Sequence, residues 1–253
     1  MDIVQLLTVG LAAIAGGAVN ALAGGGTLIT FPVLTAVGVP IVAANITNTV
    51  ALCPGYLGAT FAQLKDLRGQ GLRLWLLLPV GVLGGIGGGV LLLHTDDKIF
   101  RAVVPYLIMM AVVIMAMQDR IRAWLLRRAG KAEGVSLHDA WVLLPIIPAA
   151  VYGGFFGAGV SIIVIAVLGL VLHDSIVRLN ALKQAVSFAI NTAAAIFFLF
   201  SGKVVWSAAL VMAVGALAGG VLGGRLAGRI KPHMLRRIVI VIGTVVALIY
   251  FIK

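Results

Sequence analysis

The sequence predicts an all-α polytopic membrane protein of two inverted-topology repeats, each containing a glycine-broken or re-entrant helix. Three observations predict this fold class: the composition, a series of apolar segments, and a glycine cluster that occurs twice. The chain of 253 residues is 62% hydrophobic and only 11% charged, whereas soluble domains contain about 25% charged residues. Its mean hydropathy is +1.16. We therefore expect the chain to lie in a lipid bilayer.

Ten apolar segments alternate with short polar connections along the chain. A helix needs about 20 residues to cross the hydrocarbon core of a bilayer. The segments 27–38 and 159–172 are shorter, so we expect tilted helices or half-helices that enter the membrane and return. The predicted segments are 3–22, 27–38, 41–64, 74–93, 102–117, 140–156, 159–172, 181–200, 204–224 and 238–252.

Glycine clusters interrupt the apolar sequence at two places, Gly24-Gly25-Gly26 and, about 133 residues later, Gly157-Ala158-Gly159. Glycine weakens a helix, and hydrocarbon tolerates a broken helix only where protein or water receives the freed backbone groups. Interrupted segments at matching places in two halves point to the binding site of a transporter. Close packing of unbroken helices is the alternative, because small residues let backbones approach each other in lipid.

Spacings repeated between the two halves also indicate an internal duplication. The interval from Asn45 to Leu64 recurs from Asn180 to Leu199. An offset of 131 relates two further sets, which are Trp75, Gly84, Gly88 and Gly89 in the first half and Trp206, Gly215, Gly219 and Gly220 in the second. Equivalent loops fall on opposite sides of the membrane, which is the property of an inverted repeat. Chance similarity between apolar segments is the competing explanation.

The domain organisation follows from this duplication. We predict a first membrane repeat over 1–117, a basic cytoplasmic connecting loop over 118–139, and a second membrane repeat over 140–253. The glycines at 84–89 and 219–224 have no polar neighbours, so we expect them to pack helices together.

Basic residues gather in three loops. An even number of membrane crossings separates each pair of these loops, so all three can face the cytoplasm. Loops rich in lysine and arginine stay in the cytoplasm, and the net charge of +11 therefore needs no nucleic acid as a partner. This count places both termini in the periplasm. Met1-Asp2 supplies no basic region for a signal peptide, so we expect the first segment to be retained. The loop residues are Lys65, Arg68, Arg73, Arg120, Arg122, Arg127, Arg128, Lys131, Arg225, Arg229, Lys231, Arg236 and Arg237.

Catalytic and metal-binding groups are scarce. All eight carboxylates fall at segment ends or in loops, which argues against a carboxylate-based proton pump or cation channel. Cys53 is the single cysteine, and the four histidines lack the spacing of metal ligands. We therefore predict no catalytic site, no cofactor and no metal, and a membrane-embedded enzyme is disfavoured.

Neutral polar side chains remain inside the predicted spans, and they suit a small anion. Amides and hydroxyls beside helix N-termini stabilise negative charge, because the free N–H groups and the helix dipole point toward it. Lys183 is the one cation inside a span, either attracting an anion or extending to the headgroups. Hydrogen bonding between helices is the alternative role for the amides. The candidate substrate-binding residues are Asn20, Gly24, Gly25, Gly26, Thr27, Asn45, Thr47, Asn48, Gly157, Gly159, Ser161, Asn180, Lys183, Gln184, Ser187 and Asn191.

Several of these motifs, in this order and over essentially the whole chain, resemble the sulfite exporter TauE/SafE family of membrane permeases. They are Gly16-Gly17, Gly24 to Thr27 with Pro32, Ala44-Asn45-Ile46-Thr47-Asn48, Lys183 to Asn191 followed by Ser201 to Trp206, and Gly223-Gly224-Arg225-Leu226. The resemblance implies transport of small sulfur-containing or organic anions, such as sulfite, sulfonates or thiosulfate, across the bacterial inner membrane. The resemblance also implies that the substrate is bound by Gly24 to Thr27, Thr47, Asn48, Lys183 and Asn191.

The sequence also departs from the family pattern. Thr49 stands where a lysine often follows the Thr-Asn pair, and 178–182 differ from the usual Ala-Thr-Gly-Thr stretch. The exact anion therefore stays open, as do the direction of transport, proton or ion coupling and the oligomeric state. The function hypothesis is a secondary transporter that works by alternating access, and an anion channel is the alternative.

Overall fold

A computed structural model describes residues 1–22, 25–61, 63–128, 137–172, 174–226 and 232–252. Within these residues the chain forms ten α-helices, two short 3₁₀ helices and no strand, which confirms the all-α fold class. The elements are α1 (Ile3–Leu22), α2 (Thr27–Ala36), α3 (Ile41–Phe61), η1 (Leu64–Leu67), α4 (Gly71–Leu93), α5 (Asp97–Arg128), η2 (Leu137–Val142), α6 (Leu143–Phe155), α7 (Val160–Val171), α8 (Ile176–Leu199), α9 (Trp206–Leu226) and α10 (Pro232–Ile252).

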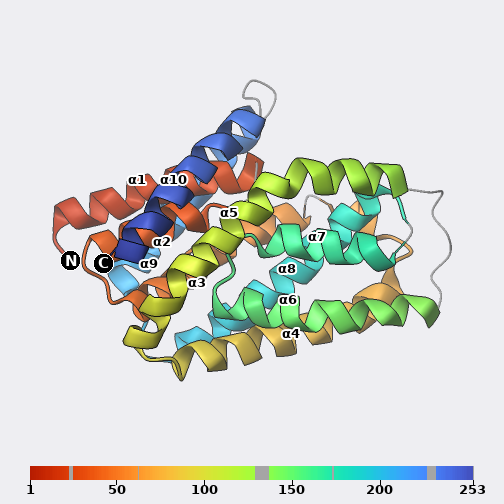
Figure 1. Ribbon diagram of the computed structural model, residues 1–253, viewed down its shortest axis with the longest axis horizontal. Coiled ribbons are helices and arrows are strands. Elements are labelled where there is room, and N and C mark those ends of the chain that lie inside the picture. The colour runs from red at the N-terminus through yellow and green to blue at the C-terminus, as the bar shows by residue number, and fades with distance from the viewer. Residues whose placement is uncertain (23–24, 62, 129–136, 173, 227–231, 253) are drawn as a thin grey trace.

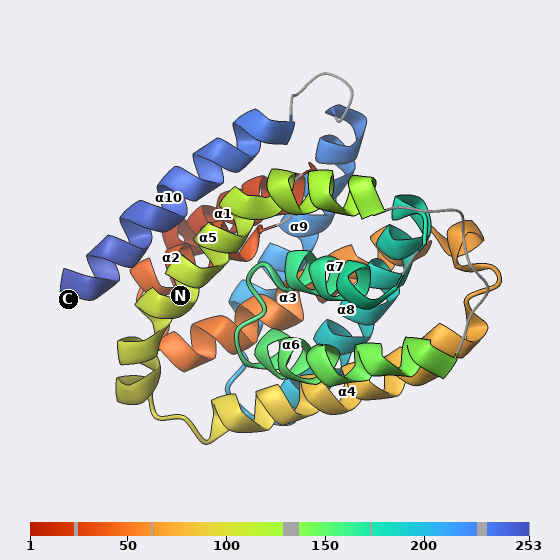
Figure 2. The same cartoon turned by 45° about the vertical axis from the view of Figure 1, so that its right-hand side comes forward.

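Five of the described helices are long and apolar enough to cross a membrane, and they lie in α1, α4, α5, α8 and α9. Together with the apolar side chains exposed along the outside of the bundle, they make the chain a multi-pass membrane protein in contact with the lipid bilayer. Both termini lie at one end of the bundle, here named the terminal end (Figure 1). The turn that contains η1, the end of α5 and the start of α8 lie at the opposite end, named the basic end (Figure 2).

The observed helices match the ten predicted segments but are longer at several ends. α5 runs to Arg128, eleven residues into the predicted connecting loop 118–139. This extension is amphipathic: Leu125 is buried against α7 beside Gly169, while Arg120 is exposed. A search for uniformly apolar segments misses such a helix end, because only one of its faces is apolar. α8 likewise begins at Ile176, five residues before the predicted start.

Two pairs of helices approach each other closely at glycines. A Cβ atom built on Gly88 of α4 would collide with the Val151 carbonyl of α6 and lie 2.6 Å from the Phe155 nitrogen. A Cβ atom on Gly219 of α9 would collide with the Ile14 carbonyl of α1. These contacts confirm the packing role expected for Gly88 and Gly219. Gly220 differs, since a Cβ atom there would meet nothing within 4 Å.

Both predicted helix breaks are present. α1 ends at Leu22 and α2 begins at Thr27, with Gly25 at φ +89°; α6 ends at Phe155 and α7 begins at Val160. Gly157 and Gly159 have φ values of +75° and +74°, a region that glycine enters without the steric cost of a side chain. α2 and α7 contain 10 and 12 residues, about 15 and 18 Å of helix, so neither is long enough to cross a membrane.

The two breaks lie at the same level of the bundle, against the middle of α5. A Cβ atom built on Gly25 would strike the end of Met115, and one built on Gly159 would lie 3.8 Å from the Ala111 Cβ. Ala111 and Met115 are one turn apart on α5. The rings of Phe31 and Phe156, one beside each break, have centroids 5.5 Å apart. The fold therefore brings the two interrupted segments together.

Candidate functional site

α3 and α8 run antiparallel through the middle of the molecule and form what we call the α3–α8 seam. Cys53 Sγ lies 3.4 Å from Thr192 Oγ1, and Asn180 Nδ2 donates to Gln63 Oε1 at 2.7 Å. Because residue numbers rise along α3 as they fall along α8, these contacts fix the antiparallel arrangement. Most of the predicted amide residues lie on these two helices.

Two asparagines of α3 each contact one of the helix breaks. Asn48 Oδ1 accepts from Thr30 Oγ1 at 2.5 Å, and Thr30 Oγ1 also lies 3.1 Å from the Gly26 carbonyl at the start of α2. Asn45 Nδ2 donates to the carbonyl of Phe155, the last residue of α6, at 2.8 Å. Asn45, Asn48 and Thr30 are fully or almost fully buried. They place polar groups beside both interruptions.

The second break has its own polar neighbours on α8. Asn191 Nδ2 donates to the Ser187 carbonyl at 2.8 Å, and a Cβ atom built on Gly157 would lie 3.6 Å from Asn191 Oδ1. Ser187 Oγ and Asn45 Oδ1 are buried and have no hydrogen-bond partner among the described residues. Such buried atoms cost free energy unless a ligand or water bonds to them. We call Thr30, Asn45, Asn48, Ser187 and Asn191 the break group.

Lys183 lies nearer the start of α8 than the break group does, one turn from Ser187 and two turns, about 12 Å along the helix, from Asn191. Its Nζ donates to Asn180 Oδ1 at 2.7 Å, and Asn180 in turn donates to Gln63 Oε1. Within the described part of the chain, Lys183 bonds to no carboxylate. The hydrogen-bond partner recorded for this cation among the described residues is therefore a neutral amide.

The other predicted site residues are distributed around these two sets. Thr47 Oγ1 accepts from the Val205 nitrogen at 3.0 Å, so it faces the connection between α8 and α9. The Asn20 Cβ would lie 3.2 Å from a Cβ atom on Gly26. Thr27 is buried in the first turn of α2, whereas Ser161 and Gln184 are half-buried on α7 and α8. Gly24 lies outside the described residues.

Two features of the structure were not predicted from the sequence. One is the packing of Phe31, Phe100 and Phe156, whose buried rings have centroids 5.5 to 6.5 Å apart and connect α2, α5 and the second break. The other is a buried ion pair at the basic end. Arg73 Nη1 of α4 lies 2.5 Å from Asp174 Oδ2, and Arg178 Nε of α8 lies 3.0 Å from the same oxygen.

Asp174 titrates outside the membrane-spanning helices, just before α8 begins. Burial alone would raise the pKa of this carboxyl, but hydrogen bonds from Arg178, Arg73 and the Ser175 N–H outweigh burial and hold the pKa below its ordinary value. A carboxyl whose pKa is lowered on folding stabilises the protein above its unfolded pKa, about 3.9. That stabilisation is lost as the pH falls through the folded pKa.

We therefore expect Asp174→Asn to lower the thermal midpoint of the detergent-solubilised protein most at neutral pH, where the aspartate is charged. The difference in thermal midpoint from the wild type shrinks as the pH falls below about 4, because protonation of Asp174 removes the charge that the arginines stabilise. Unfolding scans between pH 7 and pH 3 measure this difference. The control is Asp119→Asn, whose aspartate also pairs with an arginine, Arg236, but is exposed. A difference that is constant across the range contradicts the assignment.

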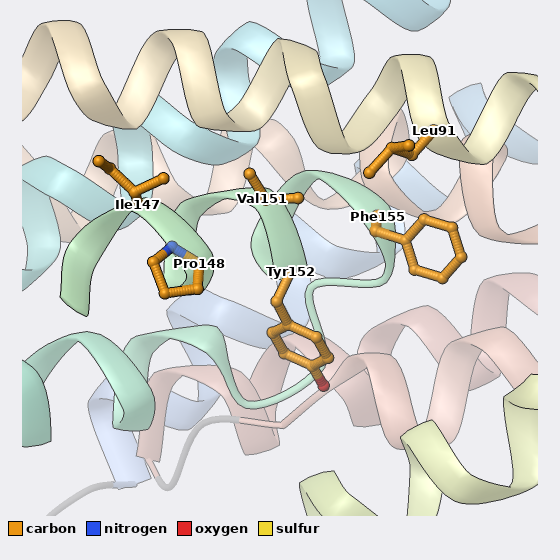
Figure 3. A pocket seen from close by; sticks show the side chains of 6 residues that line it. All are labelled: Leu91, Ile147, Pro148, Val151, Tyr152 and Phe155. Atoms are coloured by element: carbon orange, nitrogen blue, oxygen red, sulfur yellow. The ribbon is translucent and has the colours of Figure 1, made fainter. Parts of the chain in front are cut away.

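An apolar hollow of about 450 Å³ lies on the outside of α4 and α6 (Figure 3). Leu91, Ile147, Pro148, Val151, Tyr152 and Phe155 line it. No member of the break group and no charged residue lines it, so its surface suits lipid chains and not an anion. The Tyr152 hydroxyl donates to the Ala158 carbonyl at 2.7 Å and so supports the second break.

Comparison with known proteins identifies the family. A family model described as "Sulfite exporter TauE/SafE" matches residues 9–250. The chain belongs to this family. The resemblance found in the sequence motifs is therefore confirmed for this TauE/SafE protein, which is a membrane transporter and not an enzyme. No solved structure matches it significantly.

Curated relatives of this TauE/SafE protein carry transporter names. A "Probable membrane transporter protein" of Haemophilus influenzae is 29% identical over 203 residues, which are 79% of this chain and 76% of the relative. "Probable membrane transporter protein ORF9" of a Sinorhizobium species is 24% identical over 83% of this chain and 78% of its own length. "Probable membrane transporter protein YfcA" of Escherichia coli K12 is 22% identical over 93% and 85%.

Proposed function

We propose that this TauE/SafE protein carries small sulfur-containing or organic anions, of the sulfite, sulfonate or thiosulfate type, across the bacterial inner membrane. The observation that carries the proposal is Lys183, a cation within a membrane helix whose bonding partner is the neutral Asn180. Ionisable residues inside membrane spans usually serve a substrate or an ion. A lysine without a carboxylate partner is suited to attract a negative substrate, and the family description names such an anion.

The break group supplies the uncharged part of the proposed site. Half-helices whose N-termini point at an anionic group are a recurring arrangement in transporters. Here Thr30, in the first turn of α2, bonds to Asn48, and Gly157, just before α7, lies beside Asn191. Ser187 Oγ can donate to an anion, and it has no hydrogen-bond partner in the part of the chain that the structure describes. A substrate held between the breaks would satisfy this buried group.

Alternating access is the proposed mechanism, with 1–117 and 140–253 as inverted repeats joined by 118–139. The glycine contacts support it, because α1 packs on α9 while α4 packs on α6, so each repeat supplies one helix to each pair. We propose that two bodies, one built around α1 and α9 and the other around α4 and α6, rock about the α3–α8 seam. The substrate site would then open to the two sides in turn.

The proposed orientation places the basic end in the cytoplasm and both termini in the periplasm. The arginines and lysines of η1, the end of α5 and the start of α8 lie at the basic end, opposite the termini (Figure 2). Retention of basic loops in the cytoplasm supports this choice. Labelling of a cysteine introduced at either terminus in intact cells tests it.

A thermal-shift screen of the detergent-solubilised protein tests the substrate class. We expect sulfite, thiosulfate or methanesulfonate at millimolar concentration to raise the thermal midpoint, because a ligand stabilises the state that binds it. Asn48→Ala removes the amide beside the first break and should weaken this shift. Sodium chloride at equal ionic strength is the control. If none of the anions shifts the wild type more than chloride does, the proposed substrate class is wrong.

Uptake into proteoliposomes separates a transporter that works by alternating access from an anion channel. A coupled transporter accumulates the labelled anion against its gradient when a proton or ion gradient is imposed. A channel only equilibrates the anion. Equilibration without accumulation under every imposed gradient would favour the channel.

A further inference from the structure

The segment between α3 and α4 lies across the start of α8 at the basic end. This segment, Gln63–Gln70, includes η1 and is here named the strap. Asn180 Nδ2 donates to Gln63 Oε1 at 2.7 Å, and Arg178 Nη1 donates to the Arg68 carbonyl at 3.0 Å. Gln70 Nε2, which is fully buried, donates to the Arg178 carbonyl at 3.2 Å. Three hydrogen bonds therefore fasten the strap to the first two turns of α8.

Arg178 is the centre of this attachment, and Asp174 orients the Arg178 side chain. Arg178 Nε lies 3.0 Å from Asp174 Oδ2 and Nη1 reaches the strap, so the planar guanidinium joins the carboxylate to the strap backbone. Arg73 Nη1 contacts the same oxygen of Asp174, so the two arginines share Asp174 Oδ2. The Arg178 side chain is 28% exposed, whereas the side chains of Arg73 and Asp174 are at most 2% exposed. The attachment is thus open to water on one side, and releasing it leaves the buried pair intact.

The strap also borders the proposed anion site. Gln63 bonds to Asn180, which bonds to Lys183, so a single amide side chain connects the lysine to the strap. At the terminal end the matching connection, Phe200–Val205, makes a corresponding contact with the start of α3, where the Val205 nitrogen donates to Thr47 Oγ1. The connection after α3 therefore contacts the start of α8, and the connection after α8 contacts the first turns of α3.

We propose that the strap Gln63–Gln70 is the gate at the basic end and that Arg178 is the residue that holds it closed. This inference rests on the proposed function, because it assumes that Lys183 lies on the transport path. Release of the Arg178 bond to the Arg68 carbonyl lets the strap lift from α8 and exposes Lys183 to the basic side. Hydrogen bonds suit a contact that opens and closes, because water can replace the protein partner at a modest net cost in free energy.

Thiol labelling tests the gate without any substrate. The parent carries Cys53→Ser, which removes the single cysteine, and Ser187→Cys, which places a thiol one turn beyond Lys183 on α8. In oriented vesicles a charged, impermeant methanethiosulfonate reagent is added from the basic side or from the terminal side. We expect Arg178→Gln to raise the labelling rate from the basic side about tenfold, as for loss of a hydrogen bond to a charged group.

Arg68→Gln is the matched control. It makes the same replacement on the strap itself, but Arg68 contributes only its backbone carbonyl to the Arg178 bond and its side chain is exposed. We expect no change in labelling rate. Gln63→Ala is the second opening variant, and it covers the case in which Arg178→Gln does not fold, since it leaves the Asp174 ion pairs in place.

The outcomes separate the gate from the proposed function. Faster labelling from the basic side alone, in either opening variant, supports the gate. Rates equal to the parent in both variants overturn it, and so does equal acceleration from both sides, which reports general loosening. A failed anion screen with accelerated labelling would discard the substrate class and keep the gate, whereas the reverse result would discard the gate alone.

Discussion

Replacing Lys183 by alanine is expected to abolish the thermal shift that small anions produce and to lower anion uptake by at least tenfold. The variant removes the one positive charge that the described α3–α8 seam presents beyond the first turn of α8, since Arg178 at the start of α8 is held by Asp174. A hydrogen bond to a charged group contributes about 1.5–3 kcal/mol, and 1.4 kcal/mol corresponds to a tenfold change in affinity. Thermal shift and proteoliposome uptake measure the two effects.

The controls for Lys183→Ala are chosen for charge and position. Lys183→Arg keeps the positive charge and should retain part of the anion-dependent shift, although a guanidinium differs in shape from an ammonium group. Lys203→Ala removes an exposed lysine from the terminal end and should leave both measurements unchanged. If Lys183→Ala binds and transports like the wild type, the lysine only extends to the headgroups and the anion site lies elsewhere.

Valine at Gly88 is expected to cause the largest loss of stability among the glycine variants. Its Cβ atom would collide with the Val151 carbonyl and lie 2.6 Å from the Phe155 nitrogen, so α4 and α6 would have to separate. Overpacking of this kind costs about 1–3 kcal/mol, which lowers the thermal midpoint by about 2–12 °C in a chain of this size. Thermal unfolding and the yield of monodisperse protein measure the effect.

Gly87→Val provides the matched control. It is the neighbouring residue in the same helix, and a Cβ atom there would meet nothing within 4 Å. Both variants change the helix propensity equally, so the difference between them reports packing alone. Equal stability of the two variants would show that α4 and α6 adapt to the added methyl groups.

Much of the fold was predictable because its signals are local. Long apolar segments indicated the ten helices, and the clusters Gly24-Gly25-Gly26 and Gly157-Ala158-Gly159 indicated the two breaks, since lipid excludes polar connections and glycine permits positive φ values. The helix ends were less accurate. The last eleven residues of α5 mix apolar and charged side chains, so mean hydropathy falls there although the backbone remains helical.

The candidate site was predictable only in part. The amides of α3 and α8 stood out because polar residues are rare in this sequence. Their partners did not, because Asn45 bonds to Phe155, 110 residues away, and Arg73 pairs with Asp174, 101 residues away. Asp174 is the single acid between 140 and 253, which was a signal available in the sequence. Only tertiary packing shows that it is buried and that it orients Arg178.

The pairing of α1 with α9 and of α4 with α6 has a consequence for how the chain is made. When α1 and α4 are synthesised and enter the bilayer, the helices that cover their glycine faces do not yet exist. Each must wait for a partner encoded more than sixty residues further along the chain. Residues 1–117 expressed alone would therefore lack the partners that cover the glycine faces of α1 and α4, and we expect them to be less stable than the full chain.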